Sequence, residues 1–308
     1  MKSVAIVTAS DAAVGIGHLR RAQRLEVATQ SRGDIQTTLV MSDVANFDAS
    51  SLESLASDVV VIDLPPCLHT TSLDRALRSL RRAGTKVVGI DEFRTEMDLL
   101  IVPSFHVDSD NLESARRSGL PMRWGWNRLI INRRKAIAPR NPGAPVLVLT
   151  GGSDAAGLGR HLPAILESRL PPGTVVEWVT GPLAVPPTFP TTRRLRWIEH
   201  RDVSDLRPLM HAAGYALAVY GVSVLELLHH GVPTVALSPN ITRDQEHLSI
   251  LESECLARTD TDTISAVDKL SNLLADEEWS QAIAGRAANR IPEPGTMRVV
   301  EDICELLQ

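Results

Sequence analysis

Short runs of β-branched and aliphatic residues alternate along the chain with longer stretches whose apolar positions recur every three or four residues. Runs of the first kind are typical of buried strands, and stretches of the second kind are typical of amphipathic helices. Strands are predicted at 3–8, 37–41, 58–63, 86–90, 99–102, 146–150, 174–179, 194–198, 215–219 and 234–237. Helices are predicted at 17–30, 72–83, 155–167, 203–212, 222–230 and 245–251, with further helices after 263. This alternation predicts βαβ units around parallel sheets, so the fold class is α/β.

The periodic pattern is interrupted between residues 132 and 145, where prolines, a glycine and clustered charges replace the spaced apolar positions. Such a segment is typical of a domain boundary. We therefore predict one Rossmann-like domain at 1–140 and a second at 145–308, facing a central cleft. Open α/β sheets bind ligands outside the carboxyl ends of their strands, so a ligand is expected in that cleft.

Composition and charge narrow the classes of function. Of the 308 residues, 44% are apolar and 22% are charged, which excludes a disordered or coiled-coil chain. The net charge of −5 gives no general attraction to nucleic acid or to an anionic membrane surface. We expect neither as a partner, and no stretch approaches the ~20 apolar residues that a membrane span requires.

Cysteine usage points to a reducing compartment. Cys67, Cys255 and Cys304 are scattered and form no C-x-x-C pair. Neither a disulfide framework nor a cysteine metal site is predicted, and no metal or cofactor is expected. A cytoplasmic location fits best.

The first predicted strand leads into a glycine-containing loop, Gly15-Ile16-Gly17-His18, that opens directly into a helix. Glycines before a helix N-terminus let backbone N–H groups approach an anionic or polar ligand. His18 then lies in the first helical turn, where it either faces the cleft as a functional group or caps a tight turn. Because a third glycine is missing, the loop does not match a dinucleotide-binding fingerprint.

Two loops of the second half have similar chemistry. Gly151-Gly152-Ser153 follows the first strand of that half, and Ser153 or the next residue, Asp154, could instead serve as a helix N-cap. Gly221 and Ser223 follow the strand at 215–219, with Glu226 three residues after Ser223. That spacing is typical of a capping box, but the Glu226 carboxylate could equally hold the two hydroxyls of a ribose.

Other polar residues follow predicted strands or end predicted helices. Asp244 and Gln245 come after the strand at 234–237, and His229 with His230 ends a helix, where positive charge complements the helix dipole. In the first half, the residues that could face an acceptor are Asp63, Asp91 and Trp126. Strand-end carboxylates bind ligands or cap helices, and a tryptophan stacks on a sugar or fills the core.

The order of these motifs resembles the GT-B nucleotide-sugar enzymes. The second half carries Gly151-Gly152-Ser153, Gly221-x-Ser223-x-x-Glu226, Gly231-Val232-Pro233 and Asp244-Gln245, as in a GT-B donor domain. The first half contributes the segment from Gly15 to Arg21. The nearest families are the UDP-sugar hydrolase of pseudaminic acid synthesis, the spore-coat polysaccharide glycosyltransferases and, more distantly, the UDP-GlcNAc transferase that forms lipid II.

The resemblance implies a role for each motif. His18 would be the catalytic base, and the diphosphate would be bordered by Gly17, Gly151, Gly152, Ser153, Gly221 and Ser223. Glu226 would bind the ribose, while Asp244 and Gln245 would bind the sugar. A neutral imidazole can accept the proton of an attacking hydroxyl, and helix N-termini can stabilise the departing diphosphate without a metal ion.

Three segments depart from the hydrolase pattern. Ala9-Ser10-Asp11 stands in shifted order where the hydrolase has an Asp-Ala-Ser triplet. Leu64-Pro65-Pro66 replaces a segment that holds a tyrosine in the hydrolase, and Trp126-Asn127-Arg128-Leu129-Ile130 replaces its Tyr-x-x-Leu-Arg. We therefore expect a glycosyltransferase that uses a nucleotide-diphosphate sugar, UDP-linked, and a small soluble acceptor. The alternatives are a nucleotide-sugar hydrolase with water as acceptor and a non-catalytic nucleotide-sugar-binding protein. The sequence leaves the sugar, the acceptor and the oligomeric state open.

Overall fold

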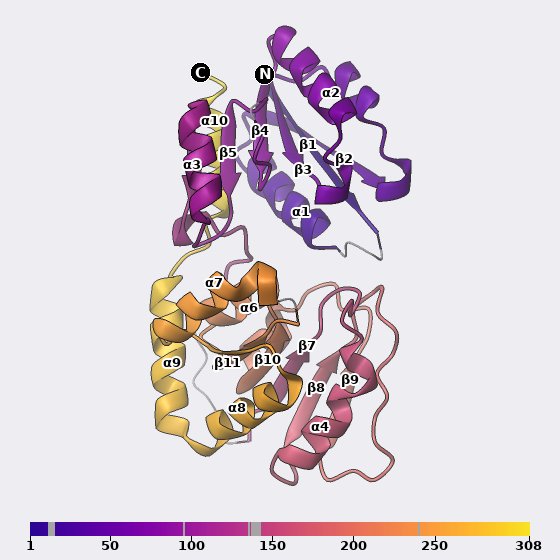
Figure 1. The fold of residues 1–308 in the computed structure, drawn as a ribbon, viewed down its shortest axis with the longest axis vertical. Coiled ribbons are helices and arrows are strands. Elements are labelled where there is room, and N and C mark those ends of the chain that lie inside the picture. Colours follow the sequence, from indigo (N-terminus) through magenta and orange to yellow (C-terminus); the bar gives the residue numbers. More distant parts are fainter. Residues whose placement is uncertain (12–15, 95, 135, 137–142, 240) are drawn as a thin grey trace. The chain divides into compact units, whose positions relative to one another are not determined.

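The structure, a computed structural model, describes residues 1–11, 16–94, 96–134, 136, 143–239 and 241–308. These residues form two compact units, Met1–Ile131 with Pro294–Gln308 and Asn132–Glu293 (Figure 1). The predicted second domain ran to residue 308, so this division differs from the prediction in its last segment. The physical reason is the apolar face of the last helix, which packs into the core of the first unit.

The first unit is a parallel sheet with strand order β2-β1-β3-β4-β5-β6. Its strands are β1 (Lys2–Ser10), β2 (Ile35–Asp43), β3 (Val59–Asp63), β4 (Lys86–Ile90), β5 (Leu99–Val102) and β6 (Met122–Trp124). Its helices are α1 (Gly17–Gln30), α2 (Thr71–Arg82), α3 (Ser109–Ser118) and α10 (Thr296–Glu305).

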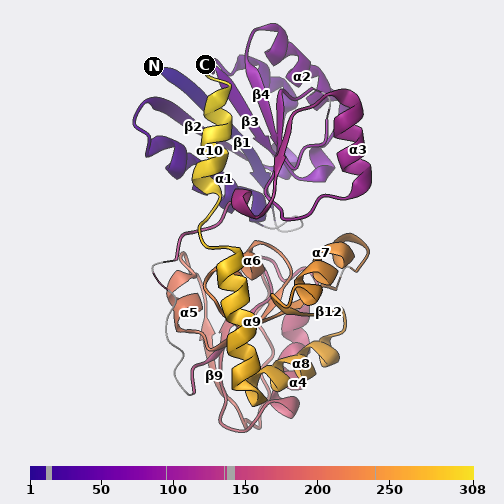
Figure 2. The ribbon, with the colours of Figure 1, turned by 90° about the vertical axis from the view of Figure 1, so that its left-hand side faces the viewer.

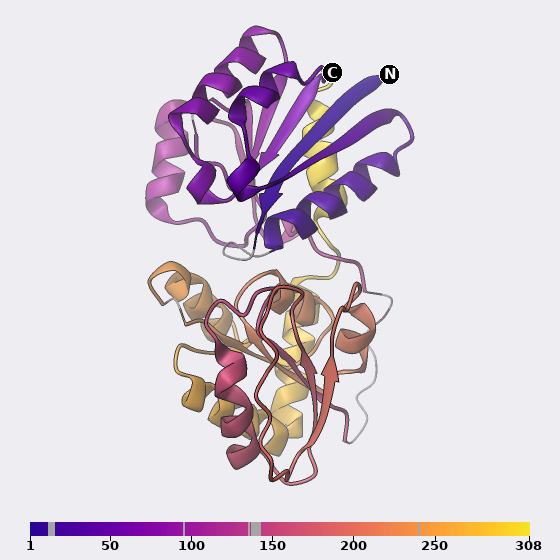
Figure 3. The same cartoon turned by 90° about the vertical axis from the view of Figure 1, so that its right-hand side faces the viewer.

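Alternate side chains of β1 contact helices on opposite faces of this sheet. Val4 and Ile6 pack with α1 and α10, whereas Ala5 and Val7 pack with α2. Figure 2 shows α10 beside α1, and Figure 3 shows α2 across the sheet from them. Successive strand residues point to opposite faces, so a strand covered on both faces is apolar throughout. The continuous apolar runs of the sequence therefore predicted buried parallel strands correctly.

The second unit repeats this plan with strand order β12-β11-β10-β7-β8-β9. Its strands are β7 (Val146–Leu149), β8 (Val175–Val179), β9 (Arg196–His200), β10 (Tyr215–Val219), β11 (Thr234–Leu237) and β12 (Arg258–Asp260). Its helices are α4 (Leu162–Arg169), α5 (Arg207–Ala212), α6 (Val222–His229), α7 (Ile241–Ser253), α8 (Thr263–Ala275) and α9 (Glu277–Arg290).

Helices α4 and α8 cover one face of the second sheet, where Trp178 is fully buried among aliphatic side chains of both helices. Helix α6 packs on β10 and β11 and against α9. In the described part of the chain, no helix has the length and apolar character needed to cross a membrane.

A buried ion pair joins α10 to the rest of the first unit. Arg128 donates from Nε and Nη2 to the two carboxylate oxygens of Asp302, at 2.8 and 3.1 Å. Asp302 is 2% exposed and Arg128 is 9% exposed. Removing one member of a buried pair leaves the other charge without compensation, which costs about 3–5 kcal/mol.

We predict that Asp302→Ala lowers the free energy of unfolding, measured by urea titration, by about 3–5 kcal/mol. The neighbouring Glu301 provides a matched control, because it pairs with Arg298 on the exposed side of the same helix. Glu301→Ala should change the free energy of unfolding by less than ~0.5 kcal/mol. Equal effects of the two substitutions would show that α10 is not held by the Arg128–Asp302 pair.

Candidate functional site

Three of the singled-out residues meet at the carboxyl edge of the first sheet. His18 is in the first turn of α1, which follows β1; Asp63 is the last residue of β3; and Asp91 directly follows β4. The strands β1, β3 and β4 are neighbours in the sheet. Parallel neighbours end at the same edge, so these side chains come together although His18 and Asp91 are 73 positions apart in sequence.

Arg21 joins the three into one network. It donates to both carboxylate oxygens of Asp63, from Nε at 2.7 Å and from Nη2 at 2.6 Å. Its Nη1 donates to Oδ2 of Asp91 at 2.6 Å. His18 Nδ1 lies 2.6 Å from Oδ1 of Asp63. A bidentate arginine–carboxylate pair fixes both groups in one plane, so the carboxylate that faces His18 is rigidly oriented.

The network keeps Asp63 and Arg21 ionised. Asp63 is fully buried, and burial raises the pKa of a carboxyl group, but Arg21 and His18 together lower the pKa of Asp63 by more, so it lies below its usual range. Burial lowers the pKa of Arg21, and the carboxylates of Asp63 and Asp91 raise it by more. Asp63 is therefore a carboxylate and Arg21 a cation at neutral pH.

This geometry selects one tautomer of His18. An ionised Asp63 can only accept, so Nδ1 of His18 carries the proton and donates it to Oδ1. Arg21 Nη2 is also 3.3 Å from Nδ1, but a protonated Nδ1 cannot accept from it. The second ring nitrogen, Nε2, is then the basic one. The His18 side chain is 22% exposed, so the imidazole is oriented by a buried carboxylate and still reachable from solvent.

This arrangement corrects the expected role of Asp63. We predicted an acceptor-facing carboxylate, but its side chain is buried and both its oxygens are bonded to His18 and Arg21. Asp63 orients His18 instead. Arg21, which the sequence-based prediction did not single out, lies three residues after His18 on α1, and residues at that spacing share a helix face. A cation at this spacing, opposite a strand-end carboxylate, is the signal that could have found it.

Asp91 has a backbone φ of 58°, in the left-handed region that aspartate tolerates better than most residues. Its carboxylate is 38% exposed and so remains accessible beside Arg21. Gly17 begins α1 and is exposed, while Gly15 lies outside the described residues.

Trp126 lies in a 3₁₀ turn, Trp126–Arg128, and its ring stacks on Phe105 with centroids 4.2 Å apart. It is half-buried. The stack fixes the ring without burying it completely, so both its packing role and an acceptor-facing role are compatible with its place.

In the second unit, Gly151-Gly152-Ser153 follows β7 and is separated from its last residue only by Thr150. Gly151 has a φ of 92°, which favours glycine. A Cβ on Gly181 would lie 2.4 Å from the carbonyl oxygens of both Gly151 and Gly152, so the loop packs directly on backbone. Asp154 accepts from the N–H groups of the residues at 158 and 159 and thus caps a short turn, whereas Ser153 is half-buried.

Helix α6 begins without a side-chain cap. Gly221 is the N-cap residue, with a φ of 157°, and as a glycine it supplies no side-chain cap. Ser223 is therefore the second helical residue and cannot form a capping box with Glu226. The capping interpretation of Ser223 and Glu226 is wrong, because the N-cap is Gly221 and the helix starts two residues earlier than this capping box needs.

Glu226 is 4% exposed and accepts two hydrogen bonds from Asn132 at its Oε1, from the backbone N–H at 3.2 Å and from Nδ2 at 3.0 Å. One turn further along α6, His229 Nε2 accepts from the N–H of Arg134 at 3.0 Å, and its Nδ1 donates to the carbonyl of Ile291 at 2.7 Å. Helix α6 thus holds the chain where it enters the second unit and near the point where it leaves.

The two histidines at the end of α6 are neutral rather than cationic. Burial is the largest cause that lowers the pKa of His229, and burial together with the neighbouring His229 lowers the pKa of His230 to about 4. Both side chains are buried. The expectation that they complement the helix dipole as positive charges is therefore wrong, because desolvation removes their charge.

Asp244 lies in the first turn of α7 and accepts a hydrogen bond from the Ser238 hydroxyl, which follows β11. Gln245 is exposed beside it. Asp244 is thereby fixed at the carboxyl edge of the second sheet. Of the residues expected in the donor site, Gly151, Gly221 and Asp244 all follow neighbouring strands, β7, β10 and β11.

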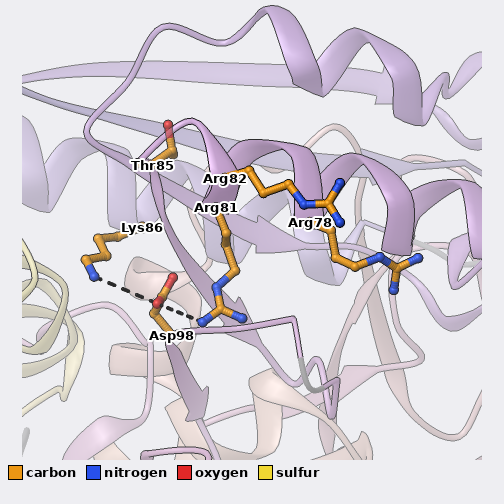
Figure 4. Close-up of a pocket in the computed structure, with 7 residues that line it drawn as sticks. Arg78, Arg81, Arg82, Thr85, Lys86 and Asp98 are labelled. Atoms are coloured by element: carbon orange, nitrogen blue, oxygen red, sulfur yellow. Dashed lines mark hydrogen bonds and ion pairs between the residues drawn. The ribbon is translucent and has the colours of Figure 1, made fainter.

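A shallow basic depression of about 410 Å³ lies elsewhere on the first unit, at the end of α2 (Figure 4). Arg81 and Lys86 both face Asp98 there, at 3.2 and 3.9 Å. Lys86 begins β4, so this depression is at the amino edge of the sheet and is not part of the His18 network. Among the described residues, no group of three or more His, Cys, Asp or Glu side chains is placed to hold a metal ion.

Comparisons with known proteins identify the fold. No protein-family model and no curated protein sequence matches the chain. Solved structures match over nearly the whole length. Acinetobacter baumannii MurG is 14% identical, with 99% of this chain and 100% of that chain covered and a TM-score of 0.62. The spinosyn forosaminyltransferase SpnP is 13% identical, with 98% of each chain covered and a TM-score of 0.67, and Phytolacca americana UGT2 complexed with UDP-2-fluoroglucose and pterostilbene is 11% identical, with 99% of each chain covered and a TM-score of 0.63. The chain has the GT-B fold, as the motif order predicted.

The neutral histidines of α6 predict a pH-dependent stability. The folded-state pKa of His230, about 4, lies below its unfolded value of about 6.5, so the unfolded chain binds the proton more readily. Stability is therefore complete above pH ~6.5 and falls as the pH decreases towards 4, by up to about 3 kcal/mol from His230. Urea titrations of His230→Gln should show a flatter pH profile in this window, whereas His161→Gln, at an exposed position, should keep the wild-type profile. Identical profiles for all three proteins would contradict a neutral buried His230.

Proposed function

We propose that the protein is a glycosyltransferase-type enzyme that transfers a sugar from a nucleotide-diphosphate donor, UDP-linked, to a small acceptor. The observation that carries this proposal is the His18–Asp63–Arg21 network, which presents an oriented, solvent-accessible imidazole at a strand edge. A carboxylate that fixes the tautomer of a histidine and stabilises its protonated form is a recurrent device of proton transfer.

The proposed reaction uses His18 as general base. Nε2 accepts the proton of an acceptor hydroxyl as that oxygen attacks the anomeric carbon of the donor. The sugar–phosphate bond breaks, and its electron pair leaves with the nucleoside diphosphate. The imidazolium that forms is stabilised by the Asp63 carboxylate, whose own charge is maintained by Arg21.

The donor is proposed to bind at the carboxyl edge of the second sheet. The backbone at Gly151-Gly152 and the uncapped start of α6 at Gly221 offer N–H groups to a diphosphate, and the helix dipole favours its charge. Ser153 and Ser223 are further candidates for this role, Glu226 for the ribose, and Asp244 with Gln245 for the sugar. Charge on the leaving diphosphate would be stabilised by these backbone donors, so the proposed step does not require a metal ion.

The GT-B fold supports this proposal, since a structural neighbour holds UDP-2-fluoroglucose. A nucleotide-sugar hydrolase, with water in place of the acceptor, uses the same base and the same donor loops. A non-catalytic nucleotide-sugar-binding protein would use the donor loops alone. These three functions differ in what His18 does and in what accepts the sugar.

The transferase is separated from the hydrolase by the acceptor dependence of donor cleavage. With a matched donor found by thermal shift among nucleotides and nucleotide sugars, release of nucleoside diphosphate should be slow in water and should accelerate when a hydroxylated acceptor is added. Product analysis by mass spectrometry checks that the glycosylated acceptor forms. Rapid release of free sugar without any acceptor would instead establish the hydrolase.

His18→Gln tests the base directly. Because glutamine cannot accept a proton at neutral pH, we expect kcat to fall roughly 10²–10⁴-fold while donor affinity changes little. His211→Gln is the matched control, since His211 is exposed on the second unit. Turnover of His18→Gln within a few-fold of wild type would remove the catalytic role and favour the non-catalytic protein.

Glu226→Gln tests the ribose site. If its carboxylate binds ribose hydroxyls, nucleotide affinity measured by calorimetry should fall by roughly 1.5–3 kcal/mol, the range for hydrogen bonds to a charged group. Asn132→Ala is the control, because it removes the side-chain amide that donates to Glu226 and keeps the carboxylate. Loss of stability in both variants with unchanged nucleotide affinity would leave Glu226 only its role of holding residue 132.

A further inference from the structure

A second histidine–carboxylate pair lies at the carboxyl edge of the first sheet. His69, between β3 and α2, donates from Nε2 to Oε1 of Glu92 at 2.8 Å. Glu92 is the second residue after β4, next to Asp91 of the His18 network. The turn after β4 therefore gives one carboxylate to each network, Asp91 to Arg21 and Glu92 to His69.

The backbone between Gly89 and Glu92 determines where the Glu92 side chain lies. Glu92 is fully buried, and a Cβ on Gly89 would lie only 2.7 Å from the Cβ of Glu92. The Asp91 backbone between them has its φ of 58°. A glycine in the interior of a strand and an unusual backbone angle both favour a specific placement of the Glu92 side chain.

The buried carboxylate is only partly satisfied by the protein. Arg94 Nε forms an ion pair with Oε2 of Glu92 at 3.4 Å but does not reach hydrogen-bond geometry, while its Nη1 donates to Asp74. Within the described residues, Oε2 has no hydrogen-bond partner. Among the described residues, the one hydrogen bond that the Glu92 carboxylate accepts therefore comes from His69 Nε2. This bond orients the imidazole and leaves Nδ1 as the ring nitrogen without a proton in the neutral state.

His69 is partly open to solvent. Its side chain is 26% exposed, whereas Glu92 is not exposed at all. Nε2 is bonded to Glu92, so Nδ1 is the ring nitrogen that can interact with a ligand. In the neutral state Nδ1 accepts a hydrogen bond. A hydroxyl group is the natural partner for such an acceptor.

We propose that His69, oriented by Glu92, binds a hydroxyl of the acceptor, and that the acceptor is a polyhydroxylated, sugar-like molecule rather than an apolar one. This inference rests on the proposed function and names the acceptor class of the same edge. Pockets for apolar ligands are lined mostly by hydrophobic and aromatic side chains. Here the strand ends present two imidazoles, each held by a buried carboxylate, which suits one hydroxyl that reacts at His18 and another that binds at His69.

Saturation-transfer NMR tests the proposal without turnover. The probes are glucose and N-acetylglucosamine, compared with pterostilbene, on the full-length protein with and without UDP. We expect the two sugars to bind and pterostilbene not to bind. His69→Gln keeps a donor for Glu92 but loses the ring acceptor, so sugar affinity should fall about tenfold, the size of one hydrogen bond. His161→Gln, at an exposed position of the second unit, should bind the sugars as the wild type does.

A different result is expected if the His69–Glu92 pair only stabilises the fold. The melting temperature of His69→Gln would then fall while sugar affinity stayed unchanged, which would overturn the proposal. Absence of sugar binding to the wild type, or preferential binding of pterostilbene, would also overturn it. If His69→Gln does not fold, the wild-type ring ¹⁵N signals of His69 serve instead: they should move when sugar is added, and unmoved signals contradict the proposal. Failure of the proposed function is recognised separately, since it appears as absent nucleotide-sugar cleavage.

Discussion

The bidentate pair between Arg21 and Asp63 is the interaction on which the candidate site depends. Asp63 is completely buried, and a buried carboxyl group without a counter-charge takes up a proton and becomes neutral. Arg21 prevents this, because it bonds both oxygens at 2.6–2.7 Å. The ionised carboxylate then determines which nitrogen of His18 carries a proton. Without the pair, the histidine would not have a fixed tautomer.

The fold was largely predictable because both sheets are parallel and covered by helices. Strands such as β4, β5, β10 and β11 are continuous apolar runs, and their predicted bounds agree with the structure. The missed strands, β6 and β12, have three residues each, lie at sheet edges and include Arg123 or Arg258. Helix α3 was missed because only Ala115 is buried in it, so its sequence lacks an apolar face. In these elements, tertiary pairing decides the structure and local pattern does not.

The site was predictable in part for the same reason. The rule that parallel strands end at one edge places His18, Asp63 and Asp91 at that edge. It does not say which side chains bond to one another. The roles of Arg21, Asn132 and His229 depend on contacts between residues far apart in the chain, up to 95 positions in the case of Arg134 and His229. Local spacing even gave a wrong partner for Glu226, because Ser223 and Glu226 have capping-box spacing in a helix that begins at Val222.

The two units contribute different chemistry. The first offers charged side chains fixed by buried ion pairs, and the second offers glycine backbone at strand ends, as in Gly151 and Gly221. This division matches the needs of glycosyl transfer, since a base must be oriented by side chains while a diphosphate can be held by backbone N–H groups. In the proposed function, proton transfer and anion binding would therefore belong to separate folding units, each with its own core.

The tautomer of His18 is the most direct measure of this account, because the catalytic proposal and the Arg21–Asp63 pair both depend on it. Ring ¹⁵N–¹H correlation NMR of histidine-labelled protein distinguishes an imidazole protonated at Nδ1 from one protonated at Nε2. We predict that neutral His18 carries its proton on Nδ1 in the wild type and that Asp63→Asn abolishes this preference. A wild-type His18 protonated at Nε2, or one whose tautomer is unaffected by Asp63→Asn, would contradict the account.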